Sequence, residues 1–546
     1  MQKILRILII IAILITCYLL ILAWRDDYAN VPKQAAQAVA TQSSGDVPSV
    51  QGGDVPVVAA SQSQSDVSDA LISVTTDRYD IKINPVGGDI VYAALKQYDA
   101  TLNSQERFVL LESNNGRTYV AQSGLIGQDG TDTQTSRATY TSPKTHYALD
   151  KTGVLHVPLI YQKDGVTITK TYTFTAGAYP IGMKYDINNA SNQPWQGQMY
   201  VQLKRDGSDD PGLADKGMMG MATYLGGAWG TPDDPYNKLK FADFGDKKLT
   251  AVSKDGWVAI IQHYFVSAWT PKEFEGTFFS RANNNEYFIG FNSPEIIVPA
   301  GKQTALEATL YAGPKVQKDL AQVAVGLNQT VDYGLLWPIS KVLFAILVAI
   351  HNVLGNWGWS IIVLTLLVKL ALMWFSNKSY VSMAKMRAIA PKLQALKDKH
   401  GDDRMAMSQE MMQLYRQEKV NPMAGCLPIL LQMPIFLALY WVLVESVELR
   451  HAPWILWIKD LSAMDPWFIL PIFMAATMFV QQLLNPQPTD PMQAKMMKIM
   501  PLIFAVFMLF FPAGLVLYWT VNNLFSMAHQ HIVNKRVAQQ MQQQST

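Results

Sequence analysis

The stretch WGWSIIVLTLLVKLALMWF, residues 357–375, decides the architecture of this chain. It is apolar over a length that can cross the hydrocarbon core of a bilayer, which takes about 20 residues. It contains a single charge, Lys369. Other long apolar runs occupy residues 7–24, 423–444, 467–484 and 500–533. Because Phe511-Pro512-Ala513-Gly514 interrupts the last run, the sequence predicts six membrane spans with that run split in two.

Charge is distributed unevenly along the 546 residues. Residues 25–340 hold 26 Lys+Arg and 33 Asp+Glu, whereas the rest of the chain holds 19 and 10. Lys3 and Arg6 precede the first span, and nine basic residues lie within 377–420. Since basic loops stay in the cytoplasm, both termini are expected inside and the acidic block outside. This pattern excludes a purely soluble enzyme and a disordered protein, and two cysteines exclude a disulfide-rich scaffold.

The acidic block divides into a tether and a folded domain. Residues 29–78 contain no aromatic residue and are rich in Ser, Gln, Ala and Gly, which predicts a flexible linker. Residues 79–315 alternate polar and apolar side chains, as in Val166–Phe174, and Asn-Gly or Asp-Gly turn pairs recur between the runs. Such alternation with tight turns predicts a large all-β domain of antiparallel sandwich type.

These patterns divide the chain into segments with expected boundaries. The expected segments are an anchor span (1–27), a linker (28–78), an exported β-sandwich (79–330), an interfacial helix (331–356), span 2 (357–376), a cytoplasmic helical hairpin (377–421), span 3 (422–446), an outside loop (447–466), span 4 (467–484), a cytoplasmic loop (485–498), span 5 (499–513), span 6 (514–533) and a cytoplasmic tail (534–546). The interfacial assignment rests on Val342–Ile350, an apolar run too short to cross the membrane.

Sequence motifs for covalent chemistry are missing from the chain. Gly301-Lys302 lacks the upstream glycine of a P-loop, and there is no Gly-x-Ser-x-Gly, no His-Glu-x-x-His and no His/Cys cluster at metal spacing. The sequence therefore predicts a protein that is not an enzyme, has no catalytic residue, and uses no metal, cofactor or nucleotide directly.

Lys369 is the most informative single residue. A lysine near the centre of a bilayer costs about 2.5–3.5 kcal/mol on insertion scales, so an intramembrane charge indicates function by default. Thr365 lies one turn earlier on the same helical face, and no acidic residue lies within any predicted span. An unpaired lysine predicts contact with an aqueous cavity. The alternative is that the amine reaches the cytoplasmic interface near Lys378. Further polar residues expected at membrane depth are Gln432, Thr520, Asn522 and Asn523.

The basic segment 378–420 has the pattern of a helical hairpin. Gly401-Asp402-Asp403 breaks it into two halves, with Leu393 and Leu396 on one side and Met411 and Leu414 on the other. Flexible methionines such as those within 405–412 suit a surface that receives varied apolar partners. The alternative is a solvated hairpin with a structural role alone.

Four stretches together resemble the YidC-type membrane protein insertases. They are Trp357–Ile362, Asn421–Phe436 with its Gln432-Met-Pro-Ile-Phe436 ending, Asp490–Gln493, and Phe511–Trp519. The likeness is close over 340–535, and the order of anchor, exported β-domain and core extends it over the chain. Two departures are that this family usually has arginine at the position of Lys369 and commonly tyrosine at that of Trp519. Lysine keeps the charge but lacks the bidentate fork.

The resemblance implies a five-span helical core with an anchor span and a β-supersandwich in the periplasm, in a bacterial inner membrane. It implies that hydrophilic tails of nascent inner-membrane proteins pass through a polar groove while their apolar segments slide into lipid. The implied partners besides these clients and the bilayer are the Sec translocon, and the ribosome and targeting factors through 380–420 and the C-terminal tail. The groove residues would be Lys369, Thr365, Gln432, Asn522 and Thr520, and the slide residues Met433, Phe436, Phe507 and Trp519.

Two other functions compete with this interpretation. An anion transporter or channel could use Lys369 as its site, but such proteins are expected to show inverted repeats, and the sequence has no such symmetry. A membrane-anchored carbohydrate-binding protein would instead carry its activity in 79–315. That hypothesis predicts a cleft with convergent acidic residues and stacked aromatic rings.

Overall fold

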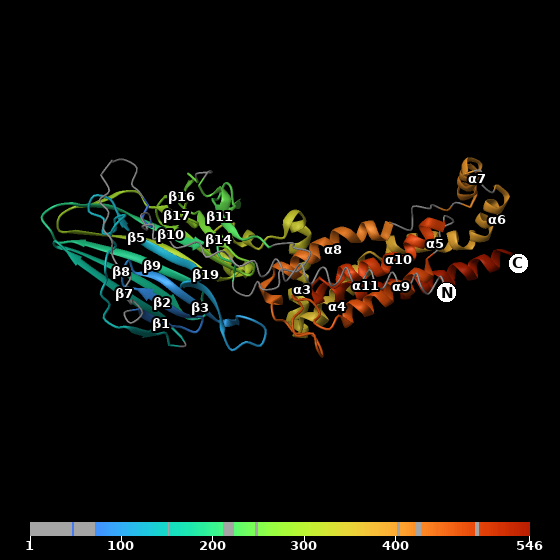
Figure 1. Cartoon of the computed structure of the whole chain (residues 1–546), viewed down its shortest axis with the longest axis horizontal. Helices are drawn as coiled ribbons and strands as arrows, with labels where there is room; N and C mark the ends of the chain where they lie inside the picture. The colour runs from blue at the N-terminus through green and yellow to red at the C-terminus, as the bar shows by residue number, and fades with distance from the viewer. Residues whose placement is uncertain are drawn as a thin grey trace. The chain divides into compact units, whose positions relative to one another are not determined.

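The computed structural model describes residues 46–48, 71–150, 152–210, 223–245, 249–400, 404–418, 420, 427–485 and 491–545. The predicted anchor span 1–27 lies outside these residues, as do most of the predicted linker 28–78 and positions 421–426 and 490 of the family-like stretches. Residues 66–546 form one compact unit, in which two β-sheets precede a set of helices (Figure 1).

The larger sheet has 11 strands within the described residues, in the order β13-β16-β17-β10-β5-β4-β3-β2-β1-β6, with β18 also paired to β10. Neighbours are antiparallel except β1 and β6, which are parallel. Its strands are β1 (Ile72–Thr75), β2 (Tyr79–Asn84), β3 (Asp89–Asp99), β4 (Arg107–Ser113), β5 (Thr118–Ile126), β6 (His146–Ala148), β10 (Trp195–Asp206), β13 (Val252–Ser253), β16 (Gly276–Asn283), β17 (Glu286–Asn292) and β18 (Ile296–Val298).

The second sheet has eight antiparallel strands in the described part, in the order β12-β11-β14-β15-β19-β9-β8-β7. Its strands are β7 (Val154–Lys163), β8 (Val166–Thr175), β9 (Pro180–Asn189), β11 (Gly226–Gly230), β12 (Asn237–Leu239), β14 (Trp257–Ile261), β15 (Phe265–Lys272) and β19 (Lys302–Pro314). Asp164 and Gly165, both at positive φ, join β7 to β8 through the Asp-Gly turn that the sequence predicts.

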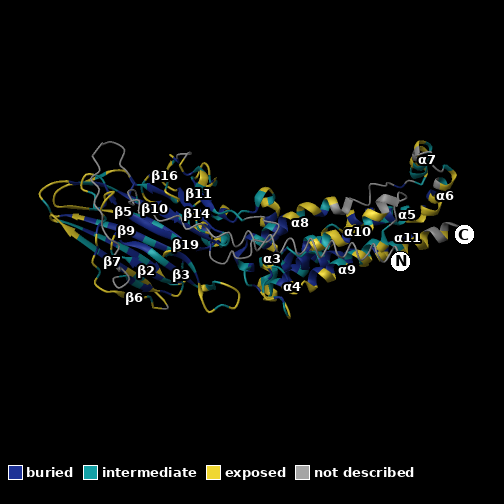
Figure 2. Cartoon of the chain, viewed as in Figure 1, coloured by how far each residue is buried: buried dark blue, intermediate teal, exposed yellow. Residues whose placement is uncertain are grey.

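Alternation along the strands explains where the core of the two sheets lies. In β8, Ile168, Lys170, Tyr172 and Phe174 are buried, while Thr169, Thr171 and Thr173 between them are partly exposed. Strands of both sheets are buried along much of their length, and Trp257 and Trp269 are fully buried in this core (Figure 2). The all-β fold predicted for this part of the chain is therefore confirmed.

The folded domain begins earlier than the sequence predicts. The expected linker extends to residue 78, but β1 occupies Ile72–Thr75 and pairs with β2. Ile72 and Val74 are 3% and 0% exposed, so their side chains belong to the core. The sequence assigns this short strand to the linker because residues 29–78 contain no aromatic residue, and composition alone does not reveal a strand of four residues.

The rest of the described chain is helical. Its α-helices are α2 (Gln317–Val323), α3 (Trp337–Leu354), α4 (Trp357–Ala371), α5 (Met373–Ala388), α6 (Ala390–His400), α7 (Arg404–Gln417), α8 (Leu427–Glu445), α9 (Ile469–Leu484), α10 (Pro491–Met508) and α11 (Ala513–Ser545). Short 3-10 turns are η2 (Phe241–Asp243), η3 (Leu327–Thr330), η4 (Gly334–Leu336) and η6 (Val447–Leu449).

Several helix boundaries differ from the predicted segments. The predicted span 357–376 breaks at Leu372, where α4 and α5 meet at a bend of 68°. No proline or glycine marks this break, so the sequence carries no signal for it. α10 begins at Pro491, within the predicted loop 485–498, and ends at Met508 rather than 513. α11 continues through the predicted tail to Ser545.

The interfacial helix is also longer than the run that predicted it. Gly334–Leu354 is helical over 21 residues with a mean hydropathy of 1.8, so the argument that this segment is too short to span was wrong. Within the described residues it is the one single helix that is long and apolar enough to cross a membrane. The bent pair α4 and α5 meets the same test together, while Leu430–Glu445 and Ile469–Leu484 are shorter apolar helices. The six-span topology stays a prediction.

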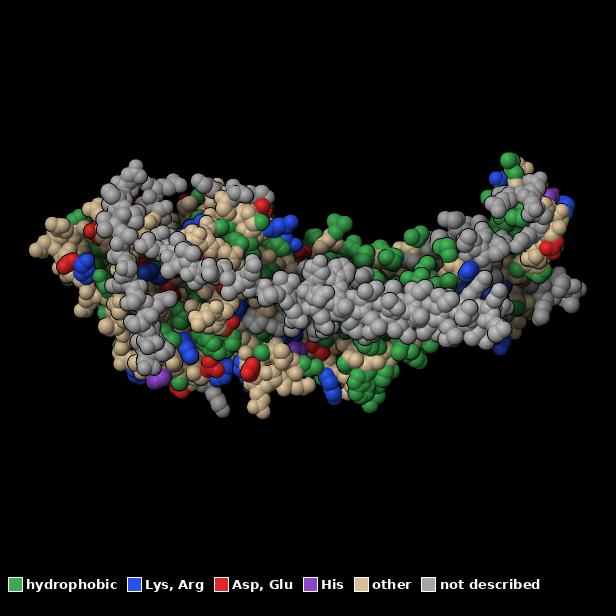
Figure 3. Space-filling model, viewed as in Figure 1, with side chains coloured by type: hydrophobic (Ala, Val, Ile, Leu, Met, Phe, Trp, Pro, Cys, Tyr) green, Lys and Arg blue, Asp and Glu red, His purple; other side chains and the backbone are tan. Residues whose placement is uncertain are grey.

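Hydrophobic side chains gather on the visible surface of the helical part (Figure 3). The exposed hydrophobic residues of the helical part include Ile472 and Phe473 on α9 and Leu502 and Ile503 on α10. A contiguous apolar surface of this kind is typical of helices that face lipid.

Candidate functional site

Lys369 lies inside the helical bundle. Its side chain is 8% exposed, and its Nζ donates a hydrogen bond of 3.0 Å to Ser526 Oγ on α11. Ser526 Oγ in turn donates to the carbonyl of Asn522 at 2.7 Å. In the described part of the chain, no carboxylate lies within ion-pair distance of this lysine. The sequence predicts that this lysine faces water because no acidic partner is present in the spans. The structure instead gives its amine a hydroxyl partner on another helix.

Two other predicted groove residues, Thr365 and Thr520, are buried and bonded within their own helices. Thr365 Oγ1 donates to the carbonyl of Ile361, and Thr520 Oγ1 to that of Val516, each at 2.7 Å. A hydroxyl that donates to the carbonyl one turn earlier needs no further acceptor, although its oxygen can still accept a hydrogen bond.

Gln432 and Asn522 complete the predicted groove set, and both are 7% exposed. Gln432, on α8, hydrogen-bonds to the hydroxyl of Tyr518 on α11. The side-chain oxygen of Asn522 is buried with no hydrogen-bond partner among the described residues. Neighbouring Asn523 donates to Thr477 Oγ1 on α9 at 3.3 Å. α11 is thus the helix that gathers polar contacts from α4, α8 and α9.

Aromatic rings pack beside these polar contacts. Phe436 on α8 and Trp519 on α11 meet edge to face with ring centroids 4.8 Å apart, and Phe504 on α10 lies 4.9 Å from the same tryptophan. Phe507 continues the cluster, 6.4 Å from Phe504. The structure therefore gathers three of the four predicted slide residues, and the fourth, Met433, is 38% exposed on α8.

The sequence interpretation missed Ser526, Tyr518 and Thr477. A signal for the first two was present, because Tyr518, Asn522 and Ser526 recur every fourth residue and so share one face of α11. Gln530 continues this stripe and donates to Asn485 Oδ1 at 3.1 Å. Thr477 carries no such pattern in α9, so only packing reveals its role.

α6 and α7 form the two arms of the basic segment. Leu393 packs in a small cluster with Met411 and Leu414, whereas Leu396 is not part of it. Lys392 pairs with Glu418 at 2.6 Å and Lys399 with Glu410 at 3.0 Å, across the two arms. The predicted break at 401–403 lies outside the described residues.

The end of α8 is bonded to the segment that leaves the β-domain. Lys315 Nζ lies 2.8 Å from Glu445 Oε2, with the two side chains 2% and 4% exposed. His263 Nε2 is 2.8 Å from the carbonyl of Val444, and the hydroxyls of Tyr333 and Ser446 are 3.2 Å apart. Burial, with a smaller effect of Lys315, lowers the pKa of His263 to about 3. A neutral imidazole therefore donates to one of the last carbonyls of the helix.

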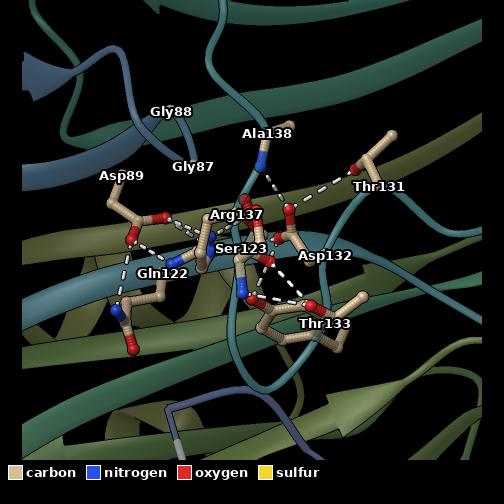
Figure 4. Close-up of polar contacts among 12 residues, drawn as sticks. Gly87, Gly88, Asp89, Gln122, Ser123, Thr131, Asp132, Thr133, Arg137 and Ala138 are labelled. Atoms are coloured by element: carbon tan, nitrogen blue, oxygen red, sulfur yellow. Dashed lines mark hydrogen bonds and ion pairs between the residues drawn. The ribbon is translucent and has the colours of Figure 1, made fainter. Parts of the chain in front are cut away.

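The carbohydrate-binding hypothesis predicts acidic side chains that converge in a cleft of the β-domain. Asp89 and Asp132 are two acidic residues that converge, on Arg137. Arg137 Nη1 donates to Asp89 at 2.6 Å and its Nε to Asp132 at 3.1 Å (Figure 4). Asp132 also accepts from the backbone of Ala138. Both carboxylates are about 5% exposed or less, so they hold the fold and face no ligand. Lys170 donates to the carbonyl of Gly87 beside them, and its burial lowers its pKa to about 7.

Comparisons with known proteins identify a family for both the β-domain and the helical part of the chain. Residues 71–346 match the model of the YidC periplasmic domain, and residues 349–540 match that of the 60Kd inner membrane protein family. The chain is 49% identical to the membrane protein insertase YidC of Stutzerimonas stutzeri, over 97% of this chain and 98% of that one. It is 47% identical to the membrane protein insertase YidC of Pseudomonas aeruginosa PAO1, again over 97% and 98%.

A solved structure of an active YidC insertase with its first transmembrane domain resolved also matches, at 18% identity and a TM-score of 0.37. That match covers 85% of this chain and 92% of the other. Two family models together match most of the chain, and relatives that are 47–49% identical align with 97% of it, so the family of this chain is established. The chain belongs to the YidC family of membrane protein insertases, whose members are not enzymes.

Proposed function

We propose that this protein moves hydrophilic tails of nascent inner-membrane proteins past the polar contacts between α4, α8 and α11. On this proposal the apolar segments of the same clients pass along the aromatic cluster into lipid. The observation that carries it is the amine of Lys369, which is buried between α4 and α11 beside a hydroxyl and no described carboxylate. A charge at that depth raises the free energy of the folded protein, so its presence indicates a function. We propose that this function is to attract an entering polar segment.

The mechanism follows from solvation. A peptide or side-chain dipole that crosses hydrocarbon without a hydrogen-bond partner costs several kcal/mol. Thr365 on α4, Gln432 on α8, and Thr520 and Asn522 on α11 offer hydrogen-bonding groups, so an entering tail exchanges water for these groups. The positive amine of Lys369 attracts acidic tails most strongly, since electrostatic interactions strengthen where water is scarce. No covalent step is involved.

Release of the client is driven by its own apolar segment. Burial of about 20 apolar residues in lipid supplies the free energy for the whole process. Phe436, Phe507 and Trp519 offer flat, apolar surfaces next to the polar contacts, so a segment can leave without exposing its side chains to them. Met433, which is 38% exposed on the same helix as Phe436, belongs to the same proposed path.

We assign the partners and the topology by the same reasoning. The hairpin α6 and α7, with its exposed Met405 and Met412 and its basic charge, is the proposed dock for the ribosome and targeting factors, together with the C-terminal part of α11. Cooperation with the Sec translocon belongs to the same proposal. Both termini lie in the cytoplasm and the β-domain in the periplasm, in agreement with the basic residues of 377–420.

The test is a client series in which only the charge of the translocated tail varies. We expect Lys369→Arg to insert all clients, because the charge is preserved. Lys369→Ala should impair acidic tails most and neutral tails least, and Lys369→Glu should impair acidic tails further. Protease protection of each client measures insertion. Equal insertion of every client by wild type, Lys369→Ala and Lys369→Glu would refute the role of the charge.

A further inference from the structure

The position of the Lys369 amine depends on one contact from a different helix. Lysine has a flexible four-carbon stem, and near a membrane surface such a stem lets the amine reach water. Lys369 is nine residues before Lys378, within reach of the side where basic residues gather. In the structure, however, the side chain is 8% exposed and its amine points to α11. Some group must hold the amine there.

Ser526 is the residue that does so. Its Oγ lies 3.0 Å from Lys369 Nζ, and within the described residues no other hydrogen-bond partner of this amine is found. The serine hydroxyl donates its own proton to the carbonyl of Asn522 at 2.7 Å. Its oxygen lone pairs are therefore turned outward from α11 and accept from the amine, which fixes both the direction and the role of the contact.

The surroundings of Ser526 restrict it further. Its side chain is 4% exposed, so water has little access to its hydroxyl. The ring of Tyr380 packs edge to face on His529 of α11, with centroids 5.1 Å apart. α11 thus contacts both sides of the 68° bend, through Ser526 with Lys369 on α4 and through His529 with Tyr380 on α5. An anchor at this bend keeps the last turn of α4, and with it Lys369, against α11.

We propose that Ser526 is a positioning residue that holds the Lys369 amine inside the bundle, with its remaining N–H groups available to an acidic client tail. An ammonium has three donors, and Ser526 accepts only one of them. A carboxylate that enters can then accept from the others without first displacing Ser526. This inference rests on the proposed function, because it names the group that makes the lysine usable for acidic clients.

The experiment measures how steeply insertion depends on tail charge, in the same client series. Wild type should favour acidic tails, and Lys369→Ala should abolish that preference. Ser526→Ala should lower the insertion of acidic tails about fivefold, the equilibrium factor for one ordinary hydrogen bond, and leave neutral tails unchanged. Ser526→Thr keeps the hydroxyl and should keep the preference. The variant Lys369→Ala/Ser526→Ala should behave as Lys369→Ala alone.

Ser360→Ala is the matched control. Ser360 is fully buried in α4 and its Oγ donates to the carbonyl of Asn356 at 2.8 Å, so its removal deletes the same kind of hydroxyl without touching Lys369. This variant should keep the charge preference of wild type. Should Ser526→Ala fail to accumulate in the membrane, Ser526→Cys, which is similar in volume and a much weaker acceptor, takes its place in the comparison.

A second readout follows the amine itself. Reaction of Lys369 with a membrane-permeant amine reagent, quantified by mass spectrometry, should accelerate in Ser526→Ala and stay at the wild-type rate in Ser360→Ala. A Ser526→Ala protein with the charge preference of wild type would overturn the inference and leave the proposed function intact, provided that Lys369→Ala abolishes the preference. If every variant, including Lys369→Ala, kept the preference for acidic tails, the proposed function would be overturned instead.

Discussion

The buried ion pair between Lys315 and Glu445 gives a prediction whose size can be worked out from the structure. The two charged atoms are 2.8 Å apart and the side chains 2% and 4% exposed, so bulk water screens neither charge. Removing one member of such a pair costs about 3–5 kcal/mol, because the other charge keeps its desolvation penalty. Glu445 is also the last residue of α8, where the helix dipole disfavours a negative charge. We expect Lys315→Met to destabilise the end of α8 by this amount.

Hydrogen exchange of the backbone amides at 442–446 measures the effect locally. A loss of 3–5 kcal/mol in the free energy of opening corresponds to an acceleration of about two to four orders of magnitude. Lys315→Met/Glu445→Gln removes both charges, so it should recover most of the lost protection. Lys272 provides a control, because its ion pair with Glu307 at 2.6 Å is solvent-exposed. Lys272→Met should change the opening free energy by less than about 1 kcal/mol.

Two results would refute this reasoning about the ion pair. One is exchange in Lys315→Met within tenfold of wild type, which would mean that Glu445 finds another partner or water. The other is a double variant that exchanges as fast as the single one, because the loss would then come from packing of the lysine stem rather than from the unpaired charge.

Three further predictions concern topology, the β-domain and pH. Cysteines introduced near 100 and 455 should react with an impermeant reagent from outside, and those near 400 and 540 should not; labelling of 540 in intact cells would contradict two spans within 500–533. Deletion of most of 79–300 should leave insertion largely intact if Lys315 and α3 are kept, and loss of growth from a stably expressed deletion would place activity in the β-domain. His263 has a folded pKa of about 3, below its usual 6.5, because burial disfavours its charged form. The unfolded chain therefore binds more protons between pH 6.5 and 3, and stability falls as pH drops through that window, by about 2 kcal/mol at pH 5. His263→Asn should flatten this part of the unfolding profile, and an unchanged profile would show that the pKa of His263 is the same in the folded and unfolded chain.

Much of the fold could be predicted because its signals are local. Alternation and Asp-Gly turns indicate strands wherever one face is buried, as in β7 and β8, whose turn is at Asp164-Gly165. Apolar runs likewise identify the helices of the core. The boundaries were less accurate, since β1 at Ile72–Thr75 and the bend at Leu372 depend on pairing and packing with distant residues. Neither has a glycine, proline or aromatic signal of its own.

The candidate site shows the same division. Composition alone singles out Lys369, because a lone charge in an apolar run is rare and costly. Its partner Ser526 is 157 residues away in sequence, and the recurrence of Tyr518, Asn522 and Ser526 marks one face of α11 without indicating which helix that face meets. The sequence by itself determined which residues are too polar for a membrane helix. Only the tertiary structure decided that α11 lies against α4 and α8, because side chains so far apart in the chain meet through packing that no local periodicity encodes.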